Sequence, residues 1–341
     1  MHDKLTYNVS VHPTNKEQIK EIYGCTFNMP TITLKDGRIL AYESFGDTTP
    51  RGTRVIFSHG LADSRLLKHW DDKLTQSLGV HIITIDQPGV GDSTDIAIER
   101  RTLKQYAEDV KELAIHLRWT DFYVAGHSGG GPHALALASY LGPDIVKGGA
   151  LAAPAPPLDY PMDPNDSEGD IWHNFEIGGP TLMRVFVQIC RWFPILVTII
   201  CKIFVWYGNY DISAYTVAIA KSDRTDGIPE TFLGDKRQTE VFEKSFKEGI
   251  KQGVCGLYGM FQVCMLAEFG FDIRTDIDKS QHFDIFVSQE DAAFKPHLGK
   301  LWCTALPSAN WHLWKNSGHY SFVDRNNWVD FWTKIREKEN K

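Results

Sequence analysis

A single serine stands in the segment Gly126-His127-Ser128-Gly129-Gly130, between an apolar run and a helix-forming run. A G-x-S-x-G pattern at such a strand-to-helix turn holds the serine in strained backbone geometry and exposes its hydroxyl. Only small neighbours let the strand and the helix approach so closely. A glycine-rich loop with an incidental serine is the alternative, and the strand-turn-helix context favours Ser128 as a nucleophile.

A serine hydroxyl becomes an effective nucleophile only when a base accepts its proton. His319 lies near the C-terminus in Ser317-Gly318-His319-Tyr320, just after the last predicted strand. Imidazole titrates near neutral pH and therefore suits this role. The position of His319 favours a catalytic base over an ordinary core or surface histidine.

The carboxylate that orients the histidine is expected between the serine and the histidine in chain order. Asp291 ends the predicted strand FDIFV and is the preferred choice. It would fix the His319 tautomer and stabilise the imidazolium without taking its proton. Glu290, next to it, and Asp159, after the preceding strand, are its rivals.

An acyl-transfer site also needs two donors for the developing oxyanion. The segment Ser58-His59-Gly60-Leu61 follows an earlier strand, so its loop can bring the Leu61 N–H opposite that of Gly129. His59 is interpreted as a structural hydrogen-bonding residue.

Neither a cofactor nor a metal ion is predicted. The turn-rich segment Asp86 to Ser93 (DQPGVGDS) lacks the G-x-G-x-x-G spacing of a dinucleotide loop, so it is interpreted as architectural. The sequence contains no HEXXH motif and no other His, Cys and Asp grouping with metal-ligand spacing.

These residues require a sheet whose strands alternate with helices. Two strands joined at the hairpin signal Asp36-Gly37 are expected within 31–46. Further strands are predicted near 54–60, 80–86, 122–125, 146–153, 282–288 and 310–314, and helices near 68–78, 103–119 and 132–141. This alternation predicts an α/β fold with a mostly parallel, doubly wound sheet.

The strand-helix rhythm stops between the strand that ends near Ala153 and the one that starts near Phe283. The interval is helical in pattern, and a structureless loop of that length would be unusual. We therefore predict an inserted helical cap at 154–270. The core would comprise 31–153 and 271–341, and 1–30 would form an N-terminal extension.

The predicted cap is rich in aromatic residues and would roof the substrate pocket, since pockets form at domain junctions. The residues expected to contact a hydrophobic substrate are Trp172, Phe175, Phe186 and Trp192. The alternative for each of them is packing of the cap on the core.

An apolar stretch, 182–207, lies inside the same region. About 20 apolar residues can span a bilayer, but Arg184, Arg191 and Lys202 recur here and Pro194 interrupts the stretch. Two short packed helices are therefore favoured over a membrane span, and the segment could rest on a membrane surface as a peripheral contact.

Composition narrows the functional classes. The chain has 341 residues, 43% of them hydrophobic, which allows a sizeable buried core. A net charge of −7 without a basic block excludes nucleic acid as an expected partner. Six cysteines without a C-x-x-C pair, and an N-terminus without an apolar signal segment, predict reduced thiols and a cytoplasmic location.

The motifs SHGLADSR, DQPGVGDS, GHSGGGPHALALA and SGHY together resemble the α/β-hydrolase superfamily. They are most similar to the prolyl-iminopeptidase-like branch, whose members carry a helical cap. This resemblance implies an acyl-enzyme mechanism without a cofactor. Two positions depart from the branch pattern, because Ala62-Asp63 replaces the common Pro-Gly and Ser288 stands where Gly usually precedes the acid.

Three functions agree with these features. The leading hypothesis is hydrolysis of a carboxylic ester or lactone of a small hydrophobic molecule. The second is cleavage of a carbon–carbon bond, or a lyase step, on the same triad, and the third is a ligand-binding protein that keeps the fold. An iminopeptidase-type aminopeptidase ranks below the ester hydrolase, because it needs a carboxylate for the free amine. Its possible sources are Asp163, Asp166, Glu168 and Asp170.

Overall fold

The computed structural model describes residues 30–66, 72–155, 185, 189–190, 192–212, 236–263, 269–291, 293–296 and 298–339. The chain divides into two compact units, Met1–Pro30 and Thr31–Lys341. Every element described below belongs to the second unit.

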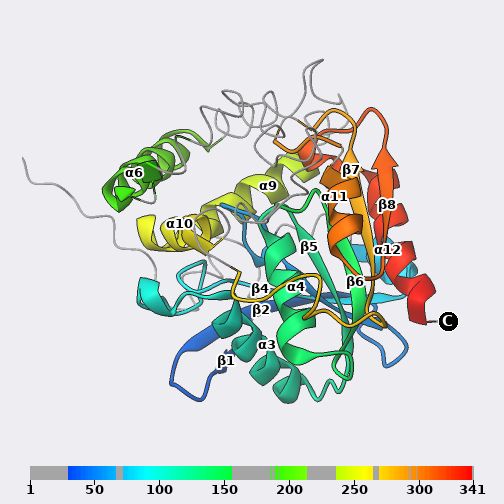
Figure 1. Cartoon of the computed structure of the whole chain (residues 1–341). Helices are drawn as coiled ribbons and strands as arrows, with labels where there is room; N and C mark the ends of the chain where they lie inside the picture. The colour runs from blue at the N-terminus through cyan, green and yellow to red at the C-terminus, as the bar shows by residue number, and fades with distance from the viewer. Residues whose placement is uncertain are drawn as a thin grey trace, which may run out of the picture. The chain divides into compact units, whose positions relative to one another are not determined.

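An eight-stranded sheet runs through the second unit (Figure 1). Its strands are β1 (Thr31–Thr33), β2 (Ile39–Gly46), β3 (Thr53–Ser58), β4 (Val80–Ile85), β5 (Phe122–His127), β6 (Val146–Ala152), β7 (His282–Ser288) and β8 (Ala309–Trp314). Their order across the sheet is β1-β2-β4-β3-β5-β6-β7-β8. β2 pairs antiparallel with β1 and β4, and all pairs from β4 to β8 are parallel.

The predicted hairpin at the N-terminal edge of the sheet is confirmed. β1 and β2 pair antiparallel, and the Leu34 N–H donates to the Arg38 carbonyl across the turn at 2.8 Å. Gly37 has a φ of +87°, which glycine adopts without strain. The Arg38 guanidinium then donates to both carboxylate oxygens of Asp109, which ties the hairpin to the helix behind it.

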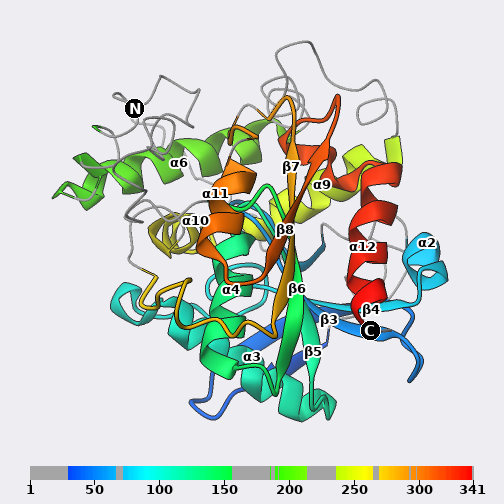
Figure 2. The ribbon, with the colours of Figure 1, turned by 45° about the vertical axis from the view of Figure 1, so that its right-hand side comes forward.

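Helices cover both faces of the sheet (Figure 2). The helical elements are α2 (Asp72–Ser77), η2 (Ile98–Arg100), α3 (Leu103–Leu117), α4 (Gly130–Leu141), α6 (Pro194–Tyr210), α9 (Lys236–Gly249), α10 (Val254–Phe261), α11 (Leu298–Ala305), η5 (His319–Val323) and α12 (Arg325–Glu339). Neighbouring strand residues point to opposite faces. Ile56 and Ile83 share a core cluster with residues of α3, α4 and α11, whereas Val55 and Ile82 share one with residues of α2 and α12. The predicted doubly wound fold is therefore confirmed.

The helices α6, α9 and α10 follow β6 and precede β7 in the chain. A Cβ on Gly249, the last residue of α9, would lie 2.6 Å from the Ala62 carbonyl oxygen in the loop after β3. A Cβ on Gly256 of α10 would overlap the carbonyl oxygen of Gly89, in the loop after β4. The end of α9 and the start of α10 therefore rest on loops at the carboxyl ends of two central strands. The boundaries predicted for a cap, 154 and 270, stay a prediction.

α6 begins at Pro194, the residue at which the sequence predicts an interruption. Proline suits the first turn of a helix, because its missing N–H would have no intrahelical partner there. From this start α6 continues for 17 residues. Among the described residues, no helix has the length and apolar character needed to cross a membrane.

Candidate active site

Ser128 occupies the turn between β5 and α4. Its φ of +53° lies in the left-handed region, where a residue with a side chain is strained. A Cβ on Gly126 would overlap the Gly130 carbonyl, and a Cβ on Gly130 would overlap the Ser58 carbonyl. The close strand-helix approach expected from the sequence is therefore present, and it requires glycine at both positions.

The structure brings Ser128, His319 and Asp291 together from three distant parts of the chain. Ser128 Oγ lies 2.9 Å from His319 Nε2, and His319 Nδ1 lies 2.9 Å from Asp291 Oδ2. The side chains of His319 and Asp291 are buried. The imidazole thus lies between a hydroxyl and a carboxylate, at hydrogen-bond distance from both.

Asp291 is held by the turn that follows β7. Its Oδ1 accepts hydrogen bonds from the backbone N–H groups of Ala293 and Phe294, both at 2.7 Å, and Oδ2 thereby faces His319. Aspartate often accepts such bonds from the two or three residues that follow it. The rival Glu290 donates its backbone N–H to the Ser317 carbonyl at 2.9 Å. The other rival, Asp159, lies outside the described residues.

The backbone of His319 is fixed independently of its side chain. His319 is the first residue of η5, whose preceding Gly318 N–H donates to Ser321 Oγ at 2.9 Å. The carbonyl of His319 accepts from His127 Nε2 at 3.0 Å, which assigns the proton to that nitrogen. The ring of Phe294 contacts the His319 ring edge-on at a centroid distance of 5.3 Å.

The loop after β3 lies directly against the serine. A Cβ on Gly60 would lie 3.2 Å from Ser128 Cβ. The next residue, Leu61, is half-buried, and Gly129 caps the N-terminus of α4. The backbone around Leu61 and Gly129, the predicted oxyanion donors, thus flanks the serine. Their role as donors stays a prediction.

The same loop is bound to α9 by a cluster that the sequence argument missed. Ser245 Oγ donates to Asp63 Oδ1 at 2.7 Å and accepts from the Ser64 N–H at 3.1 Å, and all three residues are buried. Ala62, between Leu61 and this cluster, has a φ of +62°. The departure from Pro-Gly at 62–63 therefore places a carboxylate that α9 can bind. No local pattern pairs residues 182 positions apart.

His59 has the structural role expected of it. It is fully buried, its Nδ1 lies 2.9 Å from the Gly60 carbonyl, and its Nε2 accepts from the Gln87 N–H at 3.3 Å. Gln87 belongs to the turn interpreted as architectural, in which Gly89 has a φ of +75°. His59 thus joins the loops that follow β3 and β4.

A second histidine, His133 of α4, supports the turn at Ser128 from the helix side. His133 Nδ1 lies 2.9 Å from the Gly129 carbonyl, and its ring meets Tyr106 edge-on. Burial lowers the pKa of His133 to about 4, and the hydrogen bond to Gly129 opposes this shift only in part. His133 is therefore neutral at pH 7 and is suited to a structural role, not to proton transfer.

Apolar side chains surround the site on the side of α6 and α10. Leu61 and Phe294 belong to one apolar cluster with Val197 of α6 and Leu257 of α10. Of the predicted substrate contacts, Trp172, Phe175 and Phe186 lie outside the described residues. The Trp192 side chain is 78% exposed, which does not match a place in an enclosed pocket. The described part of the chain contains no group of three or more His, Cys, Asp or Glu arranged to hold a metal ion.

Comparisons with known proteins agree with this architecture. A family model described as alpha/beta hydrolase fold matches residues 53–188. A non-heme haloperoxidase from Rhodococcus erythropolis is 28% identical over 139 residues, which span 40% of this chain and 48% of that relative. The chain therefore matches only about half the length of this curated relative.

Solved structures match over a longer range. A bromoperoxidase from Bacillus anthracis is 17% identical, with a TM-score of 0.62 and coverage of 92% of this chain and 100% of the other. An esterase from Exiguobacterium antarcticum is also 17% identical, with a TM-score of 0.62 and coverage of 91% and 99%. Together with the strand order and the serine at the turn after β5, these similarities show that the chain has the α/β-hydrolase fold.

Proposed function

We propose that the chain is a serine hydrolase that cleaves a carboxylic ester or lactone of a small hydrophobic molecule through an acyl-enzyme. The observation that carries this proposal is the series of two 2.9 Å contacts from Ser128 Oγ through His319 to Asp291. A strained serine at a helix N-terminus, with a buried imidazole as its partner, is arranged for nucleophilic catalysis.

In the first step, Ser128 Oγ attacks the carbonyl carbon while His319 Nε2 accepts the hydroxyl proton. The carbonyl oxygen becomes an oxyanion, which the N–H groups of Leu61 and Gly129 would stabilise. Asp291 keeps the Nδ1 proton of His319 in place and stabilises the imidazolium. The C–O bond then breaks, His319 gives its proton to the departing alkoxide, and an acyl-Ser128 ester remains.

In the second step, water attacks the acyl carbon while His319 accepts one of its protons. The second tetrahedral intermediate collapses, the proton returns to Ser128 Oγ, and the carboxylic acid leaves. For a lactone, the alcohol and the acid are parts of one product. The chemistry needs no group beyond those that this chain supplies.

The substrate class is inferred from the walls of the site. Leu61, Ala155 and Phe294, which adjoin the three site residues, belong to one apolar cluster with side chains of α6 and α10. An apolar acyl or ring group gains free energy by leaving water for such a wall, at about 25 cal/mol per Å² buried. A small hydrophobic substrate fits better than a charged one.

The prolyl-iminopeptidase-like interpretation has less support. An aminopeptidase needs a carboxylate to bind the free amine, and Asp163, Asp166, Glu168 and Asp170 lie outside the described residues. The relatives reported above carry esterase and haloperoxidase names, and one fold supports many reactions. Substrate assays must therefore separate ester and lactone hydrolysis from carbon–carbon bond cleavage.

The proposal is tested by labelling the protein with a fluorophosphonate and assaying p-nitrophenyl esters of short and long acyl chains. The label should attach to Ser128, and Ser128→Ala should lose both label and turnover. Ser77→Ala, which changes an exposed serine on α2, is the control and should keep both. Ester hydrolysis that survives in Ser128→Ala would overturn the proposal. If the protein cleaved a vinylogous diketone and hydrolysed no ester, its activity would be reassigned to carbon–carbon bond cleavage by the same triad.

A further inference from the structure

α6 exposes more of its large apolar side chains than it buries. Its buried residues are Val197, Cys201 and Gly208, which face α9 and α10. A second set of large apolar side chains is between 46% and 76% exposed: Ile195, Ile199, Ile203, Trp206 and Tyr210. On a helix that simply covers a core, these outward positions would be polar.

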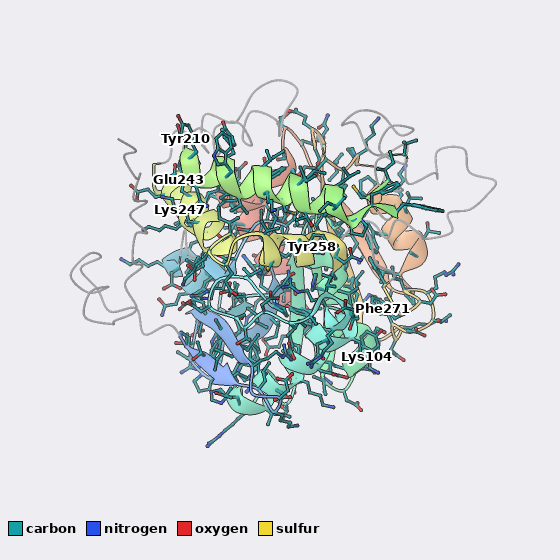
Figure 3. All side chains as sticks on the ribbon, turned by 90° about the vertical axis from the view of Figure 1, so that its left-hand side faces the viewer. Lys104, Tyr210, Glu243, Lys247, Tyr258 and Phe271 are labelled. Atoms are coloured by element: carbon teal, nitrogen blue, oxygen red, sulfur yellow. The ribbon has the colours of Figure 1, made fainter. Side chains whose placement is uncertain are left out.

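The exposed set forms one stripe. At about 100° per residue, its five members fall within an arc of about 80°, and the three buried residues lie on the opposite side of the helix. Figure 1 shows α6 as a straight helix beside α10, and Figure 3 shows Tyr210 at its end, with Glu243 and Lys247 on the adjoining α9. The three buried residues form an inner stripe that packs on α9 and α10. The five exposed residues form an outer stripe that faces solvent along the length of α6.

The charge of this region differs from that of the chain. The whole chain has a net charge of −7, yet from Leu182 to Asp211 three cations, Arg184, Arg191 and Lys202, accompany a single carboxylate, Asp211 at the C-terminal end of α6. Lys202 is exposed and lies at the edge of the outer stripe. An apolar stripe with aromatic residues and flanking cations is typical of helices that lie in a membrane interface.

We propose that the outer stripe of α6 docks on the surface of a membrane that contains anionic phospholipid. The helix lies flat, because its inner stripe stays packed on α9 and α10. The isoleucines and Trp206 enter the region between headgroups and acyl chains, and Lys202 extends to the headgroup phosphates. This proposal does not depend on the proposed hydrolase activity.

A second copy of the chain is the less favourable occupant. Lys202 lies at the middle of α6, whose bounds are Pro194 and Tyr210. In a two-fold contact of α6 with α6, the two Lys202 ammonium groups would approach each other at the symmetry axis. Like charges that face each other across an interface, even at its edge, disfavour the contact.

The test is co-sedimentation of the full chain with vesicles of phosphatidylcholine alone and of equimolar phosphatidylcholine and phosphatidylserine. We expect stronger binding to the anionic vesicles, and a loss of roughly tenfold or more in Ile199→Glu and in Ile203→Glu. Ile115→Glu, which changes a 62% exposed isoleucine on α3, is the matched control and should bind as the wild type does. Lys202→Gln should weaken only the preference for anionic vesicles, by about fivefold.

Three outcomes would overturn the proposal. One is the absence of vesicle binding by the wild type, and another is equal loss in Ile115→Glu. The third is a dimer in light scattering that Ile203→Glu converts to a monomer, which would assign the stripe to a second copy. Ser128→Ala should bind vesicles normally, so failure of the hydrolase proposal would leave this result unchanged.

Discussion

Asp291 and Glu290 are adjacent in the chain, and the structure favours Asp291 as the carboxylate that orients His319. Asp291 Oδ2 lies 2.9 Å from His319 Nδ1, and Asp291 Oδ1 is held by two backbone N–H groups. Asp291→Asn should lower kcat by about 10⁴, because the amide can donate to Nδ1 and thereby favour the wrong imidazole tautomer. Glu290→Gln should leave kcat within about twofold. Ester-hydrolysis kinetics on both variants decide between the two carboxylates, and the reverse order of effects would reassign the acid.

His133 predicts a pH dependence of stability. Its pKa in the folded chain is about 4, against a usual value of 6.5, so the unfolded chain binds a proton first as the pH falls. The contribution of neutral His133 to the free energy of unfolding is thus fully present above pH 6.5 and is lost progressively as the pH falls to about 4. The free energy of unfolding should decrease by about 3 kcal/mol from this residue over that window. Urea titrations should show a shallower pH slope for His133→Gln, whereas a slope that matches the wild type would contradict the assignment. His116→Gln, which replaces an exposed histidine of α3, is the control variant.

At the residue scale, the sequence predicts the site residues whose positions depend on short-range spacing. The glycines around Ser128 constrain the backbone within five residues, and His319 is marked by its place after the last strand. Phe294 gives no such signal, because its contact with His319 depends on the turn made by Asp291. The bond between Ser245 and Asp63 depends on where α9 packs.

At the element scale, α9 positions the loop that carries Leu61. Ser245→Ala removes the hydroxyl that links Asp63 and Ser64 to the helix. We expect a stability loss of about 1–3 kcal/mol and a fall in kcat/KM of roughly tenfold, because the loop two residues after Leu61 loses its anchor.

Thermal unfolding and p-nitrophenyl ester kinetics measure the two effects. The control is Lys247→Ala, which changes an exposed residue of the same helix and should alter neither. A Ser245→Ala variant with lower stability but unchanged kcat/KM would show that α9 supports the fold without positioning the oxyanion loop.

The strands could be predicted because they are apolar on both faces and bounded by turn residues. β3 and β4 are mainly apolar and are buried over most of their length, and the Asp36-Gly37 turn marks the hairpin before them. The helices between β6 and β7 offer a weaker signal, since apolar residues occur all around α6. Composition alone therefore could not separate its buried side from its exposed side, nor show that Trp192 lies largely exposed.

At the scale of the whole molecule, a buried charge cluster joins α9 to the sheet. The fully buried Arg65 guanidinium contacts Asp86, and it also lies 2.8 Å from Asp92 and 3.0 Å from Glu248 of α9. Lys251 bridges Asp92 and Glu248 at the outer edge. Two cations thus face three carboxylates, and these carboxylates together offset the desolvation of Arg65.

The cluster predicts unequal costs for two substitutions. Arg65→Met leaves the Asp86 carboxylate fully buried without its cation, and should lower the free energy of unfolding by about 3–5 kcal/mol. Glu248→Gln removes the charge of a side chain that is 14% exposed and leaves two cations with two carboxylates, so it should cost only about 1 kcal/mol. Urea unfolding followed by tryptophan fluorescence compares the two variants. Equal costs, or a larger cost for Glu248→Gln, would mean that the attachment of α9 and not the burial of Asp86 governs the stability of this cluster.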